Sequence, residues 1–193
     1  MNSLKTQNFI LTDMKIKKSI LFFFPLLTVL LTSCIPKSID PVEYYAEWKT
    51  LNETYYANMK DSVGYVLYTI PVNQGGSSFY YKVNAPGNQT GGSPSLTDYV
   101  KVNYRGKNIS GAIFDQTYKG SGVLVDSTAV PVTLYLGNLI PGWKQNLLQM
   151  KPGEKRTIVI PQELGYGVNG VNVIAPYSTL IFDIQLISFS PAN

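Results

Sequence analysis

Short β-rich runs separated by turn-forming residues fill most of the chain after residue 63, and one helical segment interrupts them. The run DYVKVNY at 98–104 alternates apolar and polar side chains, as a half-buried strand does. The helical segment, residues 142–150, ends at a Lys-Pro-Gly turn. This layout predicts an α+β domain with one antiparallel sheet and the helix packed on one face. The expected strands are residues 64–70, 78–83, 98–104, 132–136, 155–160 and 179–189.

A further helix is expected before these strands, over about residues 41–60. Asp40 is a suitable N-cap, Pro41 fits the first helical position, and Glu43 completes a capping box. Apolar and aromatic side chains recur at helical spacing and form a stripe. The stripe can bind a partner, or it can pack on the following domain or on a neighbouring copy of the chain. Its members are Tyr45, Trp48, Leu51 or Asn52, Tyr55 and Met59.

The beginning of the chain has the layout of a targeting segment. Three lysines between positions 15 and 18 precede the apolar run 20–33, which stops at Cys34. A charged region, an apolar region and small residues at the boundary predict a secretory signal over residues 1–33. The run is shorter than the ~20 residues that cross a bilayer comfortably. Met14 is an alternative start, because the segment from there to the cysteine is itself a complete signal.

The sequence LTSC at 31–34 resembles the lipobox cut by the lipoprotein signal peptidase. The resemblance implies that Cys34 carries a thioether-linked diacylglycerol and begins the mature chain, followed by a tether to residue 40. Ile35, in place of an aspartate after the cysteine, then implies the outer membrane of a Gram-negative cell. The expected location is the cell envelope, facing the periplasm or the surface. The alternative is a buried or free cysteine in a loop.

The composition excludes several classes of site and partner. The chain has no histidine and one cysteine, which excludes histidine-based triads, histidine-ligated metals, disulfides within the chain and thiolate zinc sites. The formal net charge is +4, but the expected signal holds four lysines and one aspartate. The remainder has 12 basic and 11 acidic side chains and no basic stripe. A nucleic-acid partner is therefore not expected.

The second half of the chain carries a series of motifs in a characteristic order. They are VKVNYRG (100–106), IFD (113–115), LGNLIPGWKQNLLQMKPGEKRTIVIP (136–161), LGYG (164–167) and VIAPYSTLIFDIQLISF (173–189). The series resembles the FKBP-type peptidyl-prolyl cis–trans isomerase domain over about residues 79–189. We therefore assign residues 79–193 to this domain and residues 41–78 to an N-terminal extension. The domain from Phe79 onward is expected to fold alone, although its loop 116–131 is longer than in compact family members.

The resemblance implies a five-stranded antiparallel sheet that wraps a short helix, with an apolar pocket between them. Tyr166 would direct its hydroxyl at a substrate carbonyl, and its position between two glycines favours an exposed functional ring. Asp115 would lie beside the reacting bond, with Lys119 as a candidate basic partner. The apolar residues carried over are Trp143 at the pocket floor, Tyr104, Phe114 and Phe182 on its walls, Leu139, Ile140, Val173 and Ile174 at its rim, and Val132 where the family more often has an aromatic ring.

The resemblance implies an enzyme that isomerises X–Pro peptide bonds and assists protein folding in the cell envelope. This reaction breaks no covalent bond, so it needs neither a nucleophile nor a metal or cofactor. The implied partners are proline-containing polypeptides, macrolides of the FK506 and rapamycin type, and the membrane. Two other functions stay open, a non-catalytic proline-binding or chaperone module and a purely structural envelope lipoprotein. Trp143, Phe114 and Phe182 can also be ordinary core residues.

Overall fold

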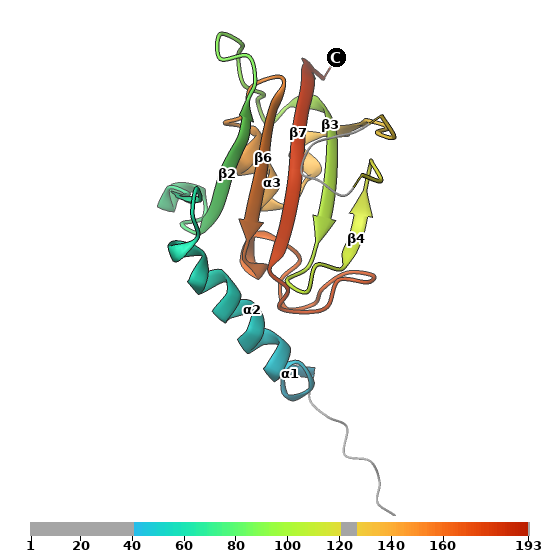
Figure 1. Ribbon diagram of the computed structural model, residues 1–193. Helices are drawn as coiled ribbons and strands as arrows, with labels where there is room; N and C mark the ends of the chain where they lie inside the picture. Colours follow the sequence, from blue (N-terminus) through green and yellow to red (C-terminus); the bar gives the residue numbers. More distant parts are fainter. Residues whose placement is uncertain (1–40, 121–126, 193) are drawn as a thin grey trace, which may run out of the picture. The chain divides into compact units, whose positions relative to one another are not determined.

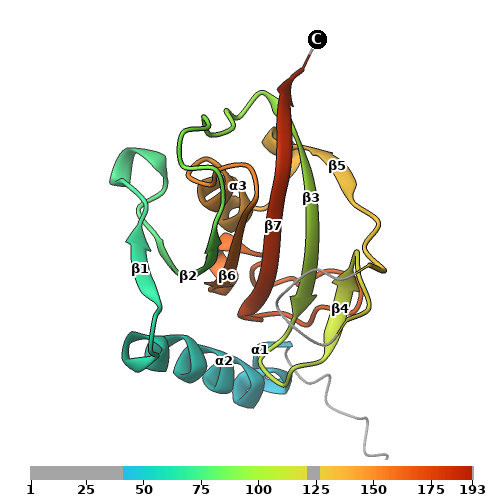
Figure 2. The same cartoon turned by 45° about the horizontal axis from the view of Figure 1, so that its top comes forward.

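The strands form one antiparallel sheet in the order β1-β2-β6-β7-β3-β4, and β5 pairs with another part of β3 (Figure 1 and Figure 2). The computed structural model describes residues 41–120 and 127–192. The strands are β1 (Val66–Thr69), β2 (Ser78–Pro86), β3 (Asp98–Lys107), β4 (Ile113–Gln116), β5 (Val132–Tyr135), β6 (Glu154–Ile160) and β7 (Leu180–Pro191). Short 3₁₀ helices occur at Val72–Gln74, Leu136–Asn138 and Gln162–Leu164.

This sheet has seven strands, where the resemblance implied five. Strand β3 is long enough to pair with two short strands on one side, with β5 through residues 99–102 and with β4 through residues 105–107. Strand β1 extends the opposite edge by pairing with β2. The expected fold class, an antiparallel sheet with a short helix on one face, is confirmed.

The inner face of the sheet carries the main hydrophobic core. On β3, Val100 and Val102 are fully buried, while Lys101 between them is exposed. On β6, Ile158 and Ile160 also lie in the main core, because residues two apart in a strand share a face, while Val159 between them is buried in a separate cluster. The alternation read from the sequence therefore fixes which side of the sheet the helix covers.

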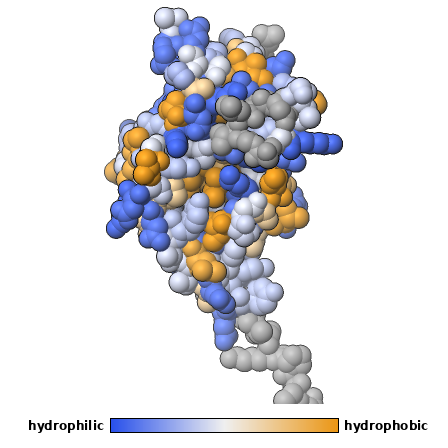
Figure 3. Space-filling view, viewed as in Figure 1, coloured by the Kyte–Doolittle hydropathy of each residue, from blue (hydrophilic) through white to orange (hydrophobic). Residues whose placement is uncertain are grey.

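The outer face of the sheet carries polar side chains that satisfy one another. The buried carboxylate of Asp183 accepts a hydrogen bond from Thr157 Oγ1 at 2.7 Å and lies 3.6 Å from Lys107 Nζ. Asn84 Nδ2 donates to Thr157 Oγ1 at 2.9 Å. A buried carboxylate requires such partners, because an isolated buried charge is costly. Figure 3 shows separate hydrophobic patches among hydrophilic side chains on the side of the molecule seen in Figure 1.

Helix α3 (Pro141–Leu147) packs on the inner face of the sheet (Figure 1). Trp143 and Leu147, four residues apart on one helix face, are buried. Proline at the first helical position fits the start, because its missing N–H has no partner there in any helix. The helix was expected to reach residue 150, but it ends at Leu147, and the backbone N–H groups of Gln149 and Met150 donate to carbonyls three residues back, ahead of the Lys-Pro-Gly segment.

A buried polar network fastens α3 to β6. Asn146 Oδ1 accepts a hydrogen bond from Arg156 Nη1 at 3.3 Å, and Arg156 Nε donates to Glu154 Oε1 at 2.6 Å. The other carboxylate oxygen of Glu154 accepts the backbone N–H of Lys151 at 2.8 Å. All three network side chains are buried. Because so short a helix is unstable by itself, these contacts and the core contacts of Trp143 hold it in place.

The N-terminal extension forms two helical segments instead of the single helix expected over residues 41–60. They are α1 (Pro41–Tyr44) and α2 (Ala46–Asn58), and a 3₁₀ turn (Met59–Asp61) follows α2. The chain leaves the helical region at Tyr45, where φ is −97° and ψ is 8°. The break turns the first segment out of the line of α2 (Figure 2).

The stripe on α2 packs on the domain that follows it. Met59 joins a second cluster on the outer face of the sheet with Tyr80, Val159 and Ile181. Asn52 is buried at 1% exposure, whereas Leu51 is 51% exposed. Of the two residues left open for this position, Asn52 therefore faces the domain. Packing on the following domain accounts for this part of the stripe.

The extension also adds to the sheet and to its core. Strand β1 lies within residues 41–78, and Ile70 after it is buried in the main cluster with Phe79. The expected signal, Cys34 and the tether to residue 40 lie outside the described residues. Across residues 41–120 and 127–192, no helix combines the length and the apolar composition needed to cross a membrane.

Candidate proline-binding site

A cavity of about 450 Å³ lies between α3 and the inner side of β3, β4 and β7. Its lining is mainly apolar and aromatic, with a few polar groups at the edge, as is typical of small-ligand sites. The lining residues are Tyr104, Phe114, Asp115, Leu134, Asn138, Leu139, Ile140, Trp143, Tyr166, Val171, Asn172, Val173, Ile174 and Phe182.

Four aromatic rings of this cavity stand edge to face. The Trp143 ring lies 5.1 Å from Tyr104 at 86° and 5.2 Å from Phe182 at 90°. Phe114 meets Phe182 at 5.5 Å and 82°. Such arrangements are the preferred geometry of aromatic pairs, so each ring fixes the orientation of the next. The result is a rigid apolar enclosure in which Trp143, only 4% exposed, occupies the inner end.

The polar edge of the cavity is built around Asp115. Tyr104 Oη donates a hydrogen bond to Asp115 Oδ2 at 2.5 Å, from β3 to the neighbouring strand β4. Burial of the Tyr104 phenol raises its pKa, and the hydrogen bond to Asp115 raises it further. The pKa of Tyr166 is raised by burial first and by the negative charge of Asp115 second. Both hydroxyls are therefore protonated, and able to donate, near neutral pH.

Two other hydrogen-bond donors at the cavity are not used within the described part of the chain. The backbone N–H of Ile140, at the start of α3, has no acceptor there. Nor does the indole Nε1 of Trp143, which is buried. An unpaired buried donor costs stability, so a ligand that supplies an acceptor regains that free energy.

The outer rim of the cavity is a tight turn. Val171 and Ile174 form an isolated β-bridge, in which each backbone N–H donates to the carbonyl of the other at 2.9 and 2.8 Å. Asn172 adopts a left-handed φ of 49°, which asparagine tolerates better than most residues. At Gly170, with φ of +63°, a Cβ atom would overlap the Ile174 carbonyl oxygen. The rim is therefore set by backbone geometry before any ligand binds.

The structure brings together all but one of the sequence-predicted pocket residues. Val132, the exception, does not line the cavity and packs against the main core. Leu134, two residues along the same face of β5, lines it instead, and the alternation of this strand was the signal that could have shown it. Lys119 forms no ion pair with Asp115. The other lining residues that sequence reasoning missed are Asn138, Val171 and Asn172.

The lining of the cavity is suited to binding and orienting a ligand. No cluster of three or more metal-ligating side chains is present in residues 41–120 and 127–192. The cavity can hold a small apolar ring against Trp143 while donors at its rim hold polar groups on either side of that ring. A proline residue within a polypeptide has this combination of an apolar ring flanked by two carbonyl groups.

The comparisons with known proteins agree with this geometry. A model of the family described as FKBP-type peptidyl-prolyl cis-trans isomerase matches residues 91–187. The chain is 41% identical over 102 residues to FkpA, an FKBP-type peptidyl-prolyl cis-trans isomerase of Escherichia coli K12, covering 53% of this chain and 35% of that protein. It is 42% identical over 109 residues to peptidyl-prolyl cis-trans isomerase Mip of Coxiella burnetii, covering 56% of this chain and 43% of that protein.

Solved structures extend the similarity beyond the family motifs. The crystal structure of Escherichia coli FkpA superposes with a TM-score of 0.65 at 32% identity, covering 79% of this chain and 64% of that one. A peptidyl-prolyl cis-trans isomerase from Pseudomonas syringae superposes with a TM-score of 0.61 at 28% identity, covering 76% and 96% of the two chains. The chain thus spans less than half the length of the two curated relatives named above. By its motifs, its sheet and its aromatic pocket, this chain belongs to the FKBP-type peptidyl-prolyl cis-trans isomerase family.

Proposed function

We propose that this protein catalyses the cis–trans isomerisation of peptide bonds that precede proline and thereby assists protein folding in the cell envelope. The observation that carries the activity is the edge-to-face enclosure of Trp143, Tyr104, Phe182 and Phe114 with unused donors at its rim. This enclosure provides an apolar binding surface for a prolyl ring. It also provides fixed dipoles for the carbonyl groups next to it.

Catalysis of this reaction requires a lower barrier to rotation about the X–Pro bond, and it requires no nucleophile. Rotation about an X–Pro bond requires the loss of amide resonance, and uncatalysed exchange takes tens to hundreds of seconds. A twisted amide has less charge separation than a planar one. An apolar enclosure that excludes water therefore disfavours the planar form more than the twisted one. Rigid walls such as Trp143 and Phe182 supply that environment without reorganising.

Hydrogen bonds at the rim hold the substrate in the twisted form. The Ile140 N–H and the Tyr166 hydroxyl are suited to the carbonyl groups that flank the proline. Asp115 acts through Tyr104, whose hydroxyl it accepts, and so positions one wall of the pocket. In this account it is a positioning residue, and the aromatic walls and the two donors contact the substrate.

A protease-coupled assay on a short X–Pro peptide tests the activity. We expect the wild-type protein to accelerate isomerisation and Phe114→Ala to lose most of the acceleration. The matched control is Tyr99→Ala, because Tyr99 is a half-exposed aromatic residue of β3 that does not line the cavity. Competition by an FK506-type or rapamycin-type macrolide would place both ligands in the same pocket.

The alternative is a module that binds proline segments without turnover. Val173, which is 79% exposed at the rim, favours binding of an unfolded chain, because it offers apolar surface beside the cavity. Titration with the same X–Pro peptide separates the two functions. Saturable binding with no change in the exchange rate would support the alternative over the enzyme.

We place the protein in the outer membrane, anchored through a lipid on Cys34. The support is the apolar run that ends at this cysteine and the lipobox-like sequence at 31–34. A diacylglycerol supplies two acyl chains, which suffices for stable anchoring. We expect the mature protein to partition into detergent and Cys34→Ala to be unprocessed or released. Recovery of Cys34→Ala in the same membrane fraction as wild type would contradict the anchor.

A further inference from the structure

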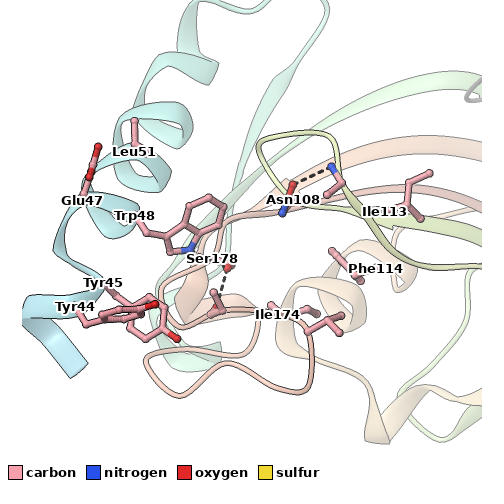
Figure 4. Close-up of a pocket in the computed structure, with 13 residues that line it drawn as sticks. Tyr44, Tyr45, Glu47, Trp48, Leu51, Asn108, Ile113, Phe114, Ile174 and Ser178 are labelled. Carbon is pink, nitrogen blue, oxygen red and sulfur yellow. Dashed lines mark hydrogen bonds between the residues drawn. The ribbon is translucent and has the colours of Figure 1, made fainter. Parts of the chain in front are cut away.

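A second cavity, of about 560 Å³, opens beside the proline pocket (Figure 4). We call it the helix groove. One wall is formed by α1 and α2, and the other by the turn before β4 and by residues 173–178. Phe114, Val173 and Ile174 line both the helix groove and the proline pocket. The two cavities are therefore neighbours separated by a wall of shared side chains.

Aromatic side chains from the N-terminal helices form the far wall of the helix groove. The rings of Tyr44 and Tyr45 meet edge to face at 4.8 Å. In Figure 4 the Trp48 indole reaches from α2 into the space between the helix and the loops. Its Nε1 donates to Ser178 Oγ at 3.2 Å. This bond holds the ring against the domain and leaves its apolar edge toward the groove.

The opposite wall is a turn held by its own hydrogen bonds. Asn108 Oδ1 accepts the backbone N–H of Ala112 at 3.0 Å, and the backbone N–H of Asn108 donates to the Ala112 carbonyl at 3.0 Å (Figure 4). Ala112 and Ile113, which follow the turn, are exposed and line the groove. Both walls are therefore fixed, and the space between them is open to solvent.

We propose that the helix groove binds the stretch of substrate polypeptide next to the isomerising proline. This inference rests on the proposed function of the neighbouring pocket. A chain whose proline sits against Trp143 must leave the pocket over its rim. Val173 and Ile174 on that rim, and Phe114 in the adjoining wall, already belong to the groove. The groove thus prolongs the binding surface along an extended chain.

The side chains that line the helix groove indicate which kind of substrate segment binds there. Tyr44, Trp48 and Ile113 present apolar and aromatic surface, which matches the exposed apolar side chains of an unfolded protein. Glu47 is the one ionisable carboxylate in the lining and has no ion-pair partner in the described part of the chain. The favoured segment therefore carries apolar or aromatic residues together with a lysine or arginine that can pair with Glu47.

The two tryptophans of the chain provide one probe for each cavity, Trp143 in the pocket and Trp48 in the groove. Their indole N–H signals can be followed by NMR during titration. A tetrapeptide that contains one proline is expected to shift the Trp143 signal alone. A longer peptide, with aromatic residues and a lysine beside the proline, is expected to shift both signals. Movement of the Trp143 signal alone with the longer peptide would overturn the proposal.

A blocking variant tests whether the groove contributes to catalysis. Ala112→Trp fills the groove without touching the hydrogen bonds of the turn, because these use backbone atoms of residue 112. We expect it to lower the ratio of kcat/KM for the longer peptide to that for the tetrapeptide by about tenfold, equivalent to ~1.4 kcal/mol. Ala57→Trp, the same change at an exposed position of α2 outside the groove, should leave this ratio unchanged. An unchanged ratio in Ala112→Trp would contradict the proposal.

The titration also tests the groove independently of the isomerase activity, and it distinguishes a substrate segment from other occupants of the groove. If wild type leaves tetrapeptide exchange uncatalysed, the isomerase activity fails, while the Trp48 shift with the longer peptide still reports on the groove. A Trp48 signal that moves with protein concentration alone would show a second copy in the groove. A Trp48 signal that moves when the residues before Pro41 are removed would show that the tether occupies the groove. Either result would overturn the proposal.

Discussion

The side-chain amide oxygen of Asn52 accepts the backbone N–H of Thr179 at 2.7 Å, joining residues that are 127 positions apart in the chain. The amide nitrogen of Asn52 donates to the carbonyl of Trp48 at 2.8 Å, and Thr179 Oγ1 donates to the Asn52 carbonyl at 3.2 Å. Both polar atoms of the buried Asn52 side chain therefore have a hydrogen-bond partner. Asn52 ties α2 to the residue that precedes β7, and so holds Trp48 beside the pocket rim.

Replacing Asn52 by leucine keeps the branched shape of the side chain but leaves the Thr179 N–H without its acceptor. We expect Asn52→Leu to lower the free energy of unfolding by about 1–3 kcal/mol, the cost of an unsatisfied buried donor. Denaturant unfolding followed by circular dichroism measures this. Asn58→Leu is the matched control, because Asn58 lies exposed at the end of the same helix. Equal stability of the two variants would show that the bond to Thr179 contributes nothing.

The hydrogen-bonding groups and the apolar walls of the pocket should differ in their effect on the rate of isomerisation. Tyr166→Phe removes one hydroxyl and should reduce kcat/KM by about five- to tenfold, since one hydrogen bond contributes on the order of 1 kcal/mol. Phe114→Ala removes an apolar wall and its edge-to-face contact with Phe182, and should leave little activity. Steady-state kinetics on one X–Pro peptide compares them. A larger loss in Tyr166→Phe than in Phe114→Ala would place the hydrogen bond above the enclosure.

Trp143 supports both the pocket and the core. Its ring contacts Tyr104 and Phe182, and it is nearly fully buried. Trp143→Ala should therefore lower the free energy of unfolding by about 3–5 kcal/mol through lost burial and the cavity left behind. The midpoint and the slope m of the urea unfolding curve together give this value. Trp48→Ala, at the half-buried tryptophan of α2, should cost clearly less. The reverse order would mean that α2 contributes more to the core than α3 does.

The pH dependence follows from two tyrosines. The pKa values of Tyr104 and Tyr166 are raised, by burial first and by Asp115 second, so both hydroxyls stay protonated from pH 6 to 8. With no histidine in the chain, kcat/KM should be nearly flat across this interval. A sharp change in kcat/KM near pH 6.5 would require another titrating group.

The raised pKa values of these two tyrosines also predict that the protein loses stability at alkaline pH. Above about pH 10 the unfolded chain loses its tyrosine protons while the folded chain keeps them. The unfolded state then binds fewer protons, so the free energy of unfolding falls as pH rises toward the raised values of Tyr104 and Tyr166. Below pH 10 this contribution is fully present. The double variant Tyr104→Phe and Tyr166→Phe should lose less stability than wild type between pH 9 and 11 in urea unfolding.

Much of the fold could be predicted from local patterns. Alternation identified β3 as a strand before any partner was known, and the aromatic and glycine motifs placed Trp143, Phe114, Phe182 and Tyr166 around one pocket. Those motifs lie within continuous runs of sequence. Strand β4 was harder to predict, since this short strand, absent from the expected set, takes its conformation from the pairing with its longer neighbour β3.

The positions that sequence reasoning missed depend on contacts between distant residues. Whether Leu51 or Asn52 faces the domain is decided by Thr179, which no local pattern of α2 encodes. Leu134 lines the pocket and Val132 does not, although the two side chains share one face of β5. Whether the chain from Phe79 onward folds alone stays a prediction. Ile70, which would be lost, lies in the main core.

Exchange NMR on a tetrapeptide with one X–Pro bond measures the central claim most directly, since it follows cis–trans interconversion at equilibrium without a coupling protease. Catalytic amounts of the wild-type protein should bring the exchange from tens or hundreds of seconds into the subsecond range. The Phe114→Ala variant, shown by circular dichroism to be folded, should leave it close to the uncatalysed rate. A folded wild-type protein that binds the peptide but leaves its exchange at the uncatalysed rate would contradict the account.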